Sequence, residues 1–488
     1  MRLKKCQPVA IDAADPFKND VLDRKANVEI LTQFITSYEQ SIVLCIDAGW
    51  GQGKTTFIKM WQQYLKKLDI PTIYFNAWES DYTDDALIAL IGEIGLAIDN
   101  LSGENKSKAK GLFSTLKNKI GYLAKDASLK EWLPIVATIG SLISGGRIKA
   151  DKIAEFTANL GASLAKDQIE KYEKSKQVLF EFKQELSRLA ECYCGNDDKK
   201  PLVIFIDELD RCRPNFAIEV LEKAKHLFNV DNIIFVLATD KTQLGHSIRA
   251  VYGQGLDVNG YLRRFIDFDY LLPSPVRSDF IVSLSKQLGL DKYLINRITF
   301  FAGPLGIILQ NLISLYNLTL REQEALCNIL NIAVRTRSYF LEDNRVLVLF
   351  LLSILKLKFP DLYKSLNKYN KSNFISNVLE NINSHYPDNT DNTDNIDNID
   401  NIDNDTYYLK FLEFLECMLL SVIRPASQFS YEETVDDYVR KYNFNDVKKQ
   451  KLIDSFDMVK GFEITIQELL LIKDTIEISS SFTLNWAV

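Results

Sequence analysis

The sequence predicts an α/β protein in which a parallel sheet is flanked by helices, with a long helical insertion and an all-helical C-terminal region. Three observations support this prediction. A glycine-rich loop stands between an apolar run and an amphipathic segment, apolar runs alternate with helix-type segments up to about residue 275, and strand patterns then cease. Such alternation is typical of parallel sheets, whose ligands bind at the carboxyl ends of the strands.

The first element is a segment of helical periodicity within residues 1–38, which we expect to cover one side of the sheet. Residues 41–47 follow as a buried strand, and Lys54 to Leu68 as an amphipathic helix. The loop between them, AGWGQGKTT, matches the pattern G-x-x-x-x-G-K-S/T, except that alanine occupies the first glycine position. The order strand, loop, helix is the one that this pattern requires.

This loop is predicted to bind the phosphates of a nucleotide. Its backbone N–H groups can face phosphate oxygens, and a lysine adds a full positive charge. We expect Lys54 to hold the outer phosphates and to assist catalysis, and the Thr55 hydroxyl to ligate Mg²⁺. A glycine-rich turn that binds nothing is the alternative. The residues of the loop predicted to bind the nucleotide are Ala48, Gly49, Trp50, Gly51, Gln52, Gly53, Lys54, Thr55 and Thr56.

Further strands complete the predicted core, and a helical segment follows each of them. They are residues 72–76, the start of residues 201–228, and the start of residues 232–244. Asn76, Asp207 and Thr239 therefore fall at the carboxyl ends of strands, as the glycine-rich loop does.

A helical insertion into the core is predicted at about residues 100–200, because lysines are frequent there and strand patterns are absent. Its last part, Lys166 to Ala190, reads as a long charged helix. We therefore place the nucleotide-binding core at residues 1–275 and a helical region at residues 276–488. Within that region, the repeat DNTDNTDNIDNIDNIDND at residues 388–405 is predicted to be disordered, with a role in binding Ca²⁺ left open.

Composition limits the partners. A net charge of −7 and a pI near 5.4 argue against a protein that coats nucleic acid with its whole surface, although local basic patches leave nucleic acid binding possible. Seven cysteines at irregular spacing favour reduced thiols and a cytoplasmic location. No apolar run reaches the roughly 18–20 residues of a spanning helix, so we do not expect a membrane protein.

Hydrolysis needs a carboxylate near the Mg²⁺ and an acidic group that orients the attacking water. In the sequence IDELD, Asp207 is predicted to belong to the metal site and Glu208 to act on the water. Neighbouring side chains of an extended strand point to opposite faces, so both must lie where the strand ends and the chain turns. Asp210 is a rival for the role of base, and capping of the next helix is the alternative for all three.

Two further groups are candidates for the site. Thr239 or Asp240 could contact the γ-phosphate or the water, while Arg263 or Arg264 could stabilise developing charge in its own or a neighbouring subunit. Either arginine could equally form a surface ion pair. ATP is the predicted nucleotide, because the places where a GTPase has N-K-x-D and D-x-x-G read ATDK and DELD.

Together, these segments resemble the KAP family of P-loop NTPases, over residues 11–300 and more loosely to about residue 330. The sequences that carry the resemblance are DPFKNDVLDRKANVEILTQFI, DAGWGQGKTTFIKMW, YFNAWESDY, IDELDRC, YLRRFIDFDYLLP and LTLRE. The resemblance implies a lid-like segment at about residues 276–335, from which Arg321 reaches the nucleotide. Where the family usually has a lysine, this chain has Arg264, which keeps the charge.

The resemblance also implies a biological setting. Prokaryotic members often serve in antiviral defence, so we expect an ATPase that works with partner proteins, as a homo-oligomer or within a hetero-complex. Many members carry spanning helices in the insertion, and this chain has no run of that length. A nucleotide-gated scaffold that hydrolyses ATP slowly or not at all, possible at a membrane, is the main alternative, and a small-molecule kinase is a third.

Overall fold

The computed structural model describes most of the core and parts of the helical region. The described residues are 9–38, 40–83, 86–98, 103–125, 177–178, 180–193, 200–224, 230, 232–273, 279–290, 298–299, 303–336, 343–367, 371–384 and 464–481, with short pieces between 416 and 450. The repeat at residues 388–405 and the first part of the predicted helix at 166–190 lie outside them. The chain divides into two units, one of Ala10–Ser274 and one containing Pro275–Val488.

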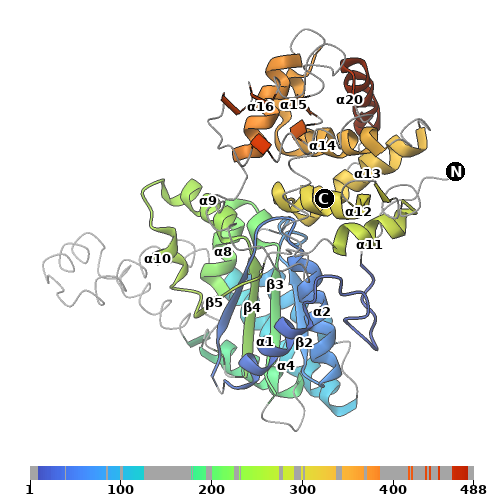
Figure 1. The fold of residues 1–488 in the computed structure, drawn as a ribbon. Coiled ribbons are helices and arrows are strands. Elements are labelled where there is room, and N and C mark those ends of the chain that lie inside the picture. Colours follow the sequence, from blue (N-terminus) through green and yellow to red (C-terminus); the bar gives the residue numbers. More distant parts are fainter. Residues whose placement is uncertain are drawn as a thin grey trace, which may run out of the picture. The chain divides into compact units, whose positions relative to one another are not determined.

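The first unit contains a five-stranded parallel sheet, which confirms the predicted fold class (Figure 1). Along the sheet the order is β2-β3-β4-β1-β5. The strands are β1 (Val43–Asp47), β2 (Thr72–Asn76), β3 (Leu202–Asp207), β4 (Ile233–Thr239) and β5 (Phe268–Leu271). The sequence analysis did not predict β5, an edge strand of four residues whose side chains alternate between half-buried and exposed.

Both faces of this sheet are covered by helices, and alternate residues of each strand enter two separate apolar cores. In β3, for example, Ile204 and Ile206 belong to one core, and Val203 and Phe205 to the other. Helices α1 (Lys25–Thr36) and α2 (Lys54–Lys67) pack on the Phe205 side. The opposite core contains residues of α3 (Ala86–Ala97), α8 (Pro214–Ala224), α9 (Lys241–Tyr252) and α10 (Val258–Leu262). Burial on both sides explains why the central strands read as unbroken apolar runs.

The described parts of the insertion are helical, as predicted. They are α4 (Gly103–Lys125) and residues 180–193, and neither contains a strand. Leu116 of α4 and Phe182 of the second segment are fully buried in the core that faces α3. The Tyr193 hydroxyl donates to the Ile94 carbonyl at 2.9 Å, which fixes the end of the insertion against α3 just before the chain enters β3.

The second unit is built mainly from helices (Figure 1). Its described elements are α11 (Asp279–Leu288), β6 (Ile298–Thr299), β7 (Gly303–Pro304), α12 (Leu305–Leu315), α13 (Leu320–Thr336), α14 (Asp343–Lys358), α15 (Pro360–Ser365), α16 (Lys371–Ser384) and α20 (Ile466–Ser481). The region was predicted to be all-helical, and among its described residues the short antiparallel pair β6–β7 is the exception. Helix α14 is tied to α20 by an ion pair of Arg345 and Glu468 at 2.8 Å. Among the described helices of the whole chain, none has the length and apolar character needed to cross a bilayer.

Trp61 of α2 joins three elements of the first unit. It is fully buried, its indole N–H donates to the Thr32 hydroxyl of α1 at 2.9 Å, and its ring meets Phe205 of β3 edge-on at 5.4 Å. Helix α2, which follows the glycine-rich loop, is therefore held against the sheet by one large side chain.

We expect Trp61→Ala to lower the free energy of unfolding by about 3–5 kcal/mol, because it leaves a cavity in the core and removes the hydrogen bond that the Thr32 hydroxyl accepts. Denaturant unfolding of the ligand-free protein measures the change. Tyr82→Ala is the control, since that side chain is 86% exposed in the same unit; its effect should stay within about 0.5 kcal/mol. A Trp61→Ala loss no larger than that of the control would contradict this account of the packing.

Candidate nucleotide-binding site

The order of the strands decides which side chains meet at the site. Strand β4 lies between β1 and β3, with Asp47 opposite Thr239 and Asp207 opposite Ala238. The carboxyl ends of all three strands therefore lie at one edge of the sheet. The chain leaves β1 through the glycine-rich loop, β3 through the acidic sequence Asp207-Glu208, and β4 through Thr239.

The loop from Ala48 to Gly53 turns sharply into α2. Gly51 and Gly53 have φ angles of 76° and 83°, a left-handed conformation that strains any residue with a side chain. No side chain caps the first turn of α2, so the backbone N–H groups at its start are available to an anion. Ala48, which replaces the first glycine of the pattern, has no positive φ and is buried in the apolar core, so its methyl group fits.

Lys54, the first residue of α2, folds back over this loop. Its side chain is 9% exposed, and its ammonium group donates to the Ala48 carbonyl at 2.5 Å and to the Gly49 carbonyl at 3.4 Å. A phosphate bound by the loop would lie close to this positive charge. Lys54 can therefore compensate the negative charge of the outer phosphates with a group that the fold already holds in place.

Asp207, at the end of β3, is fully buried and well supplied with donors. Its carboxylate accepts hydrogen bonds from the Tyr74 hydroxyl at 2.9 Å and from the Glu208 backbone N–H at 2.8 Å. Burial raises the pKa of this carboxyl, while hydrogen bonds from Tyr74 and Thr55 act in the opposite direction. Burial and the charges of Asp207 and Glu208 raise the pKa of the Tyr74 phenol, so it remains a donor at neutral pH.

The contact between Thr55 and Asp207 is the one that a magnesium site requires. Thr55 lies in the first turn of α2, which follows β1, and Asp207 ends β3, and β1 and β3 flank β4. They are the two predicted ligands. A hydroxyl and a carboxylate are hard oxygen donors, which Mg²⁺ prefers, and the ion keeps several waters as further ligands. The residues present therefore fit Mg²⁺.

The backbone turns away from the direction of β3 at Glu208. Its φ angle is 61°, a left-handed conformation that is uncommon for a residue with a side chain. This turn separates its side chain from that of Asp207. One carboxylate oxygen pairs with Arg211 at 3.3 Å, and the other accepts a hydrogen bond from the Asn76 amide at 3.4 Å. The Arg211 guanidinium also lies 5.9 Å from the ring centre of Trp78, so it is held from a second side.

Asp210 lies in the short helix η2 (Leu209–Arg211) and is 7% exposed. One of its oxygens accepts a hydrogen bond from the Thr239 hydroxyl at 3.2 Å, and the other accepts from the indole N–H of Trp50 in the loop. Asp240 has a different use, because its carboxylate caps α9 by accepting from the N–H groups of Thr242 and Gln243 at 3.0 and 3.1 Å.

The candidate arginines are placed differently from one another. Arg263 lines a cavity of about 250 Å³, next to Lys241 and Asp269, which form an ion pair at 2.9 Å. Arg264 is exposed and close enough to Tyr252 to lower the pKa of its phenol, although burial raises that pKa overall. Arg321 lies in the first turn of α13, in the other unit, and its approach to a nucleotide stays a prediction.

Two residues of this site were not found from the sequence. Tyr74 lies two residues before Asn76 on β2, so both side chains point to the same face, and that spacing was a usable signal. Arg211 follows Glu208 by three residues, a spacing that brings side chains together on a helical turn. Tyr74 and Arg211 both lie in segments that had already been interpreted through other residues.

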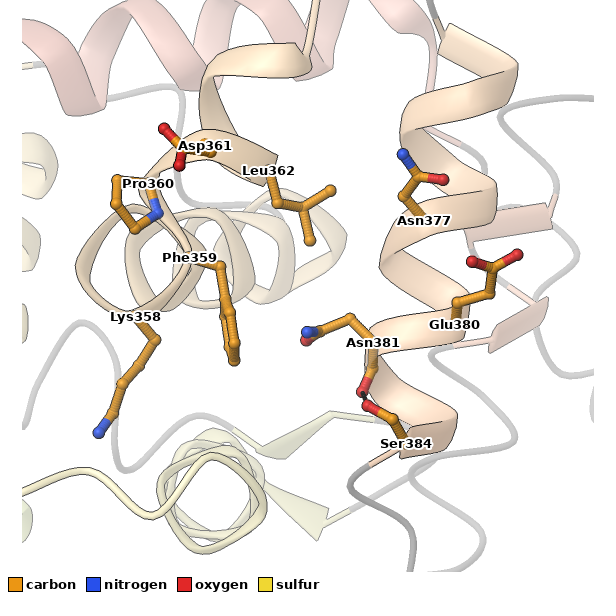
Figure 2. Close-up of a pocket in the computed structure, with 9 residues that line it drawn as sticks. All are labelled: Lys358, Phe359, Pro360, Asp361, Leu362, Asn377, Glu380, Asn381 and Ser384. Carbon is orange, nitrogen blue, oxygen red and sulfur yellow. Dashed lines mark hydrogen bonds between the residues drawn. The ribbon is translucent and has the colours of Figure 1, made fainter.

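A second hollow lies in the C-terminal unit and is shown in Figure 2. It has a volume of about 570 Å³ and lies between residues 358–362 and the helix α16, whose Asn377, Glu380, Asn381 and Ser384 face it. Lys358, at its margin, pairs with Glu322 at 2.9 Å. None of the residues predicted to bind nucleotide lines this hollow, so we give it no part in the site.

A glycine loop at the start of α2, with a buried aspartate beyond the neighbouring strand, defines the class of P-loop nucleotide-binding proteins. A family model described as "KAP family P-loop domain" matches residues 24–337. This match spans more than half of the chain, and the chain therefore belongs to the KAP family.

Comparisons with curated proteins and with solved structures add less about this chain. No curated protein matches the chain. Among solved structures, it is similar to the ORC2 protein of Aeropyrum pernix, determined as ADPNP-ADP complexes, with 12% identity and a TM-score of 0.30 over 94% of this chain and 95% of that one.

We expect Tyr74→Phe to lower the free energy of unfolding by about 1–3 kcal/mol, because it removes a donor from the buried carboxylate of Asp207. Denaturant titration without nucleotide or metal ion measures the change. Tyr82→Phe removes a hydroxyl from a side chain that is 86% exposed and serves as the control. Equal stabilities of the two variants would show that the Tyr74 hydroxyl contributes nothing to holding Asp207.

Proposed function

We propose that this chain binds ATP with Mg²⁺ and hydrolyses it at the carboxyl ends of β1, β3 and β4. The observation that carries the proposal is the glycine-rich loop, with its buried lysine directed onto it, at the same edge of the sheet as the buried carboxylate of Asp207. ATP is chosen over GTP because the sequence has neither of the two GTPase motifs at the corresponding strand ends.

Each residue then has a definite task. The loop N–H groups and Lys54 bind the phosphates, and Thr55 and Asp207 hold the Mg²⁺, which when bound neutralises charge on the phosphate oxygens. Glu208 accepts a hydrogen bond from the attacking water and orients it toward the γ-phosphorus. Of the two oxygens of Glu208, one is fixed by Arg211, which leaves the side chain little freedom to move away from that position.

The remaining candidates are assigned by their contacts. Thr239 is the better candidate for the γ-phosphate, because the carboxylate of Asp240 is used to cap α9. Arg264 is exposed, as an arginine that acts on the site of a neighbouring subunit would be. Arg321 remains a proposed nucleotide contact from the C-terminal unit.

The biological role that we propose is that of an ATPase component in a prokaryotic antiviral defence system, in the cytoplasm. Hydrolysis would be coupled to a conformational change or to assembly with partner proteins, as a homo-oligomer or a hetero-complex. Membership of the KAP family supports this role, since prokaryotic members are often found in defence. Nucleic acid is a possible trigger.

A specific contact favours a second candidate function, a nucleotide-gated scaffold with slow turnover. The carboxylate of Glu208 is engaged by both Arg211 and Asn76, and a base that is held in this way is restrained from acting on water. In this case ATP binding, rather than hydrolysis, would recruit partners.

Replacement of Lys54 by alanine is expected to weaken ATP binding by at least roughly 100-fold, because the charge-assisted contacts with the outer phosphates are lost. Calorimetric titration with ATP and Mg²⁺ measures this. Lys66→Ala is the matched control, as Lys66 is an exposed residue in the last turn of the same helix. If both variants bound ATP as the parent does, the loop would not be the nucleotide site.

Replacement of Glu208 by glutamine is expected to leave ATP affinity within about threefold and to reduce turnover by roughly 100-fold or more, since the base is lost while the shape is kept. Steady-state phosphate release, with and without double-stranded DNA, measures turnover. Asp210→Asn tests the rival base and Glu29→Gln, from an exposed pair, is the control. Parental turnover in Glu208→Gln would remove Glu208 from the mechanism, and binding without turnover by the parent would favour the scaffold.

A further inference from the structure

The carboxylate of Asp210 connects three segments that surround the proposed nucleotide site. Asp210 of η2 accepts a hydrogen bond from Trp50 in the glycine-rich loop and another from Thr239 at the end of β4. The Ala48 backbone N–H, at the start of the loop, also donates to the Thr239 carbonyl at 3.3 Å. The loop after β1, the turn after β3 and the end of β4 are thus linked through side chains as well as through the sheet.

The surroundings of Asp210 differ from those expected of a general base. It is 7% exposed, and both of its oxygens already accept a hydrogen bond from a neighbouring side chain. Trp50, in contrast, is 46% exposed, which is unusual for an indole. Its N–H points inward to the carboxylate while its ring remains accessible. The hydrogen bond to Asp210 therefore helps to fix a ring that is only about half buried.

The hydroxyl of Thr239 has a single proton, and in this structure that proton is donated to Asp210. The Thr239 side chain is fully buried in this structure, so a γ-phosphate oxygen that reached the end of β4 would have to displace the groups that cover it and would then compete for this proton. A diphosphate has no group at that place and would leave the bond to Asp210 intact. ATP and ADP therefore make different demands on the contact between Thr239 and Asp210, and through Asp210 on Trp50.

We propose that Trp50, Asp210 and Thr239 form a relay that links the presence of the γ-phosphate to the position of the glycine-rich loop, with Asp210 as a positioning residue and not the base. The proposal rests on the proposed function, because it assumes that nucleotide binds at this loop. When Thr239 turns its proton to the γ-phosphate, Asp210 is left with Trp50 as its side-chain donor, and that contact strengthens.

Two substitutions remove the donors without changing the charge. Trp50→Phe removes the indole N–H, and Thr239→Val removes the hydroxyl and keeps the shape of the side chain. We expect each to reduce the preference for ATP over ADP by roughly threefold or more, the size of effect seen for residues of one hydrogen-bond network. A purely structural role would weaken ATP and ADP binding by the same factor.

The test is a double-variant cycle read by ATP and ADP affinities of the full chain. Trp50→Phe, Thr239→Val and their combination are made in the parent and again with Asp210→Ala. The combined effect on the ATP preference should differ from the product of the single effects by roughly twofold or more with Asp210 present. With Asp210→Ala the effects should multiply independently.

Controls separate the possible outcomes. Asp361→Asn changes a carboxylate whose side chain is 99% exposed and should leave both affinities unchanged. Thermal unfolding without nucleotide identifies any variant that fails to fold, in which case Trp50→Tyr replaces Trp50→Phe as a second aromatic without the indole N–H. Equal changes for ATP and ADP, or independence with Asp210 present, would overturn the relay. If the parent bound neither nucleotide, the proposed function itself would fail.

Discussion

Burial of both faces of the sheet is the constraint on which the rest of this structure depends. Every residue of β3 and β4 is buried, and their side chains enter two apolar cores in alternation. Neither face can hold a charged group that is open to a ligand, because a buried charge without partners is costly. Polar chemistry is therefore confined to the strand ends, and the order of the strands decides which polar residues meet there.

Asp207 shows the energetic cost of placing a carboxylate at the end of a buried strand. It is the last residue of the buried strand β3 and is itself fully buried, so its carboxylate has no access to bulk water and its pKa is raised. The donors that surround it, Tyr74 and the Glu208 N–H, offset part of that penalty. A divalent cation would offset more, since an acidic group that is poorly solvated in the free protein gains more from a positive partner. The cost of burying this carboxylate in the free protein and the metal affinity that we propose for it would thus have one cause.

Most of the fold could be predicted from the sequence, because the two signals used, glycine spacing and apolar periodicity, are local. The five residues of β2 were predicted with their observed bounds, and α2 begins at Lys54 as predicted, since glycine spacing and apolar periodicity are properties of neighbouring residues. Strand β5 was missed, because a strand of only four residues, FDYL, is too short for an apolar pattern to stand out. The contact between Trp50 and Asp210 was missed for another reason: it depends on the order of the strands, which periodicity does not contain.

The choice between Glu208 and Asp210 illustrates that limit. Both carboxylates follow Asp207 within three residues, and their spacing favours neither. The left-handed turn at Glu208 sends the two in different directions: Glu208 to the side of Asn76 on β2, and Asp210 to the side of Thr239 on β4. β4 lies next to β1, and Asp210, on the β4 side, is bonded to the glycine-rich loop through Trp50. The two acids therefore have different neighbours, since Glu208 lies beside Asn76 and Arg211 while Asp210 is bonded to the loop.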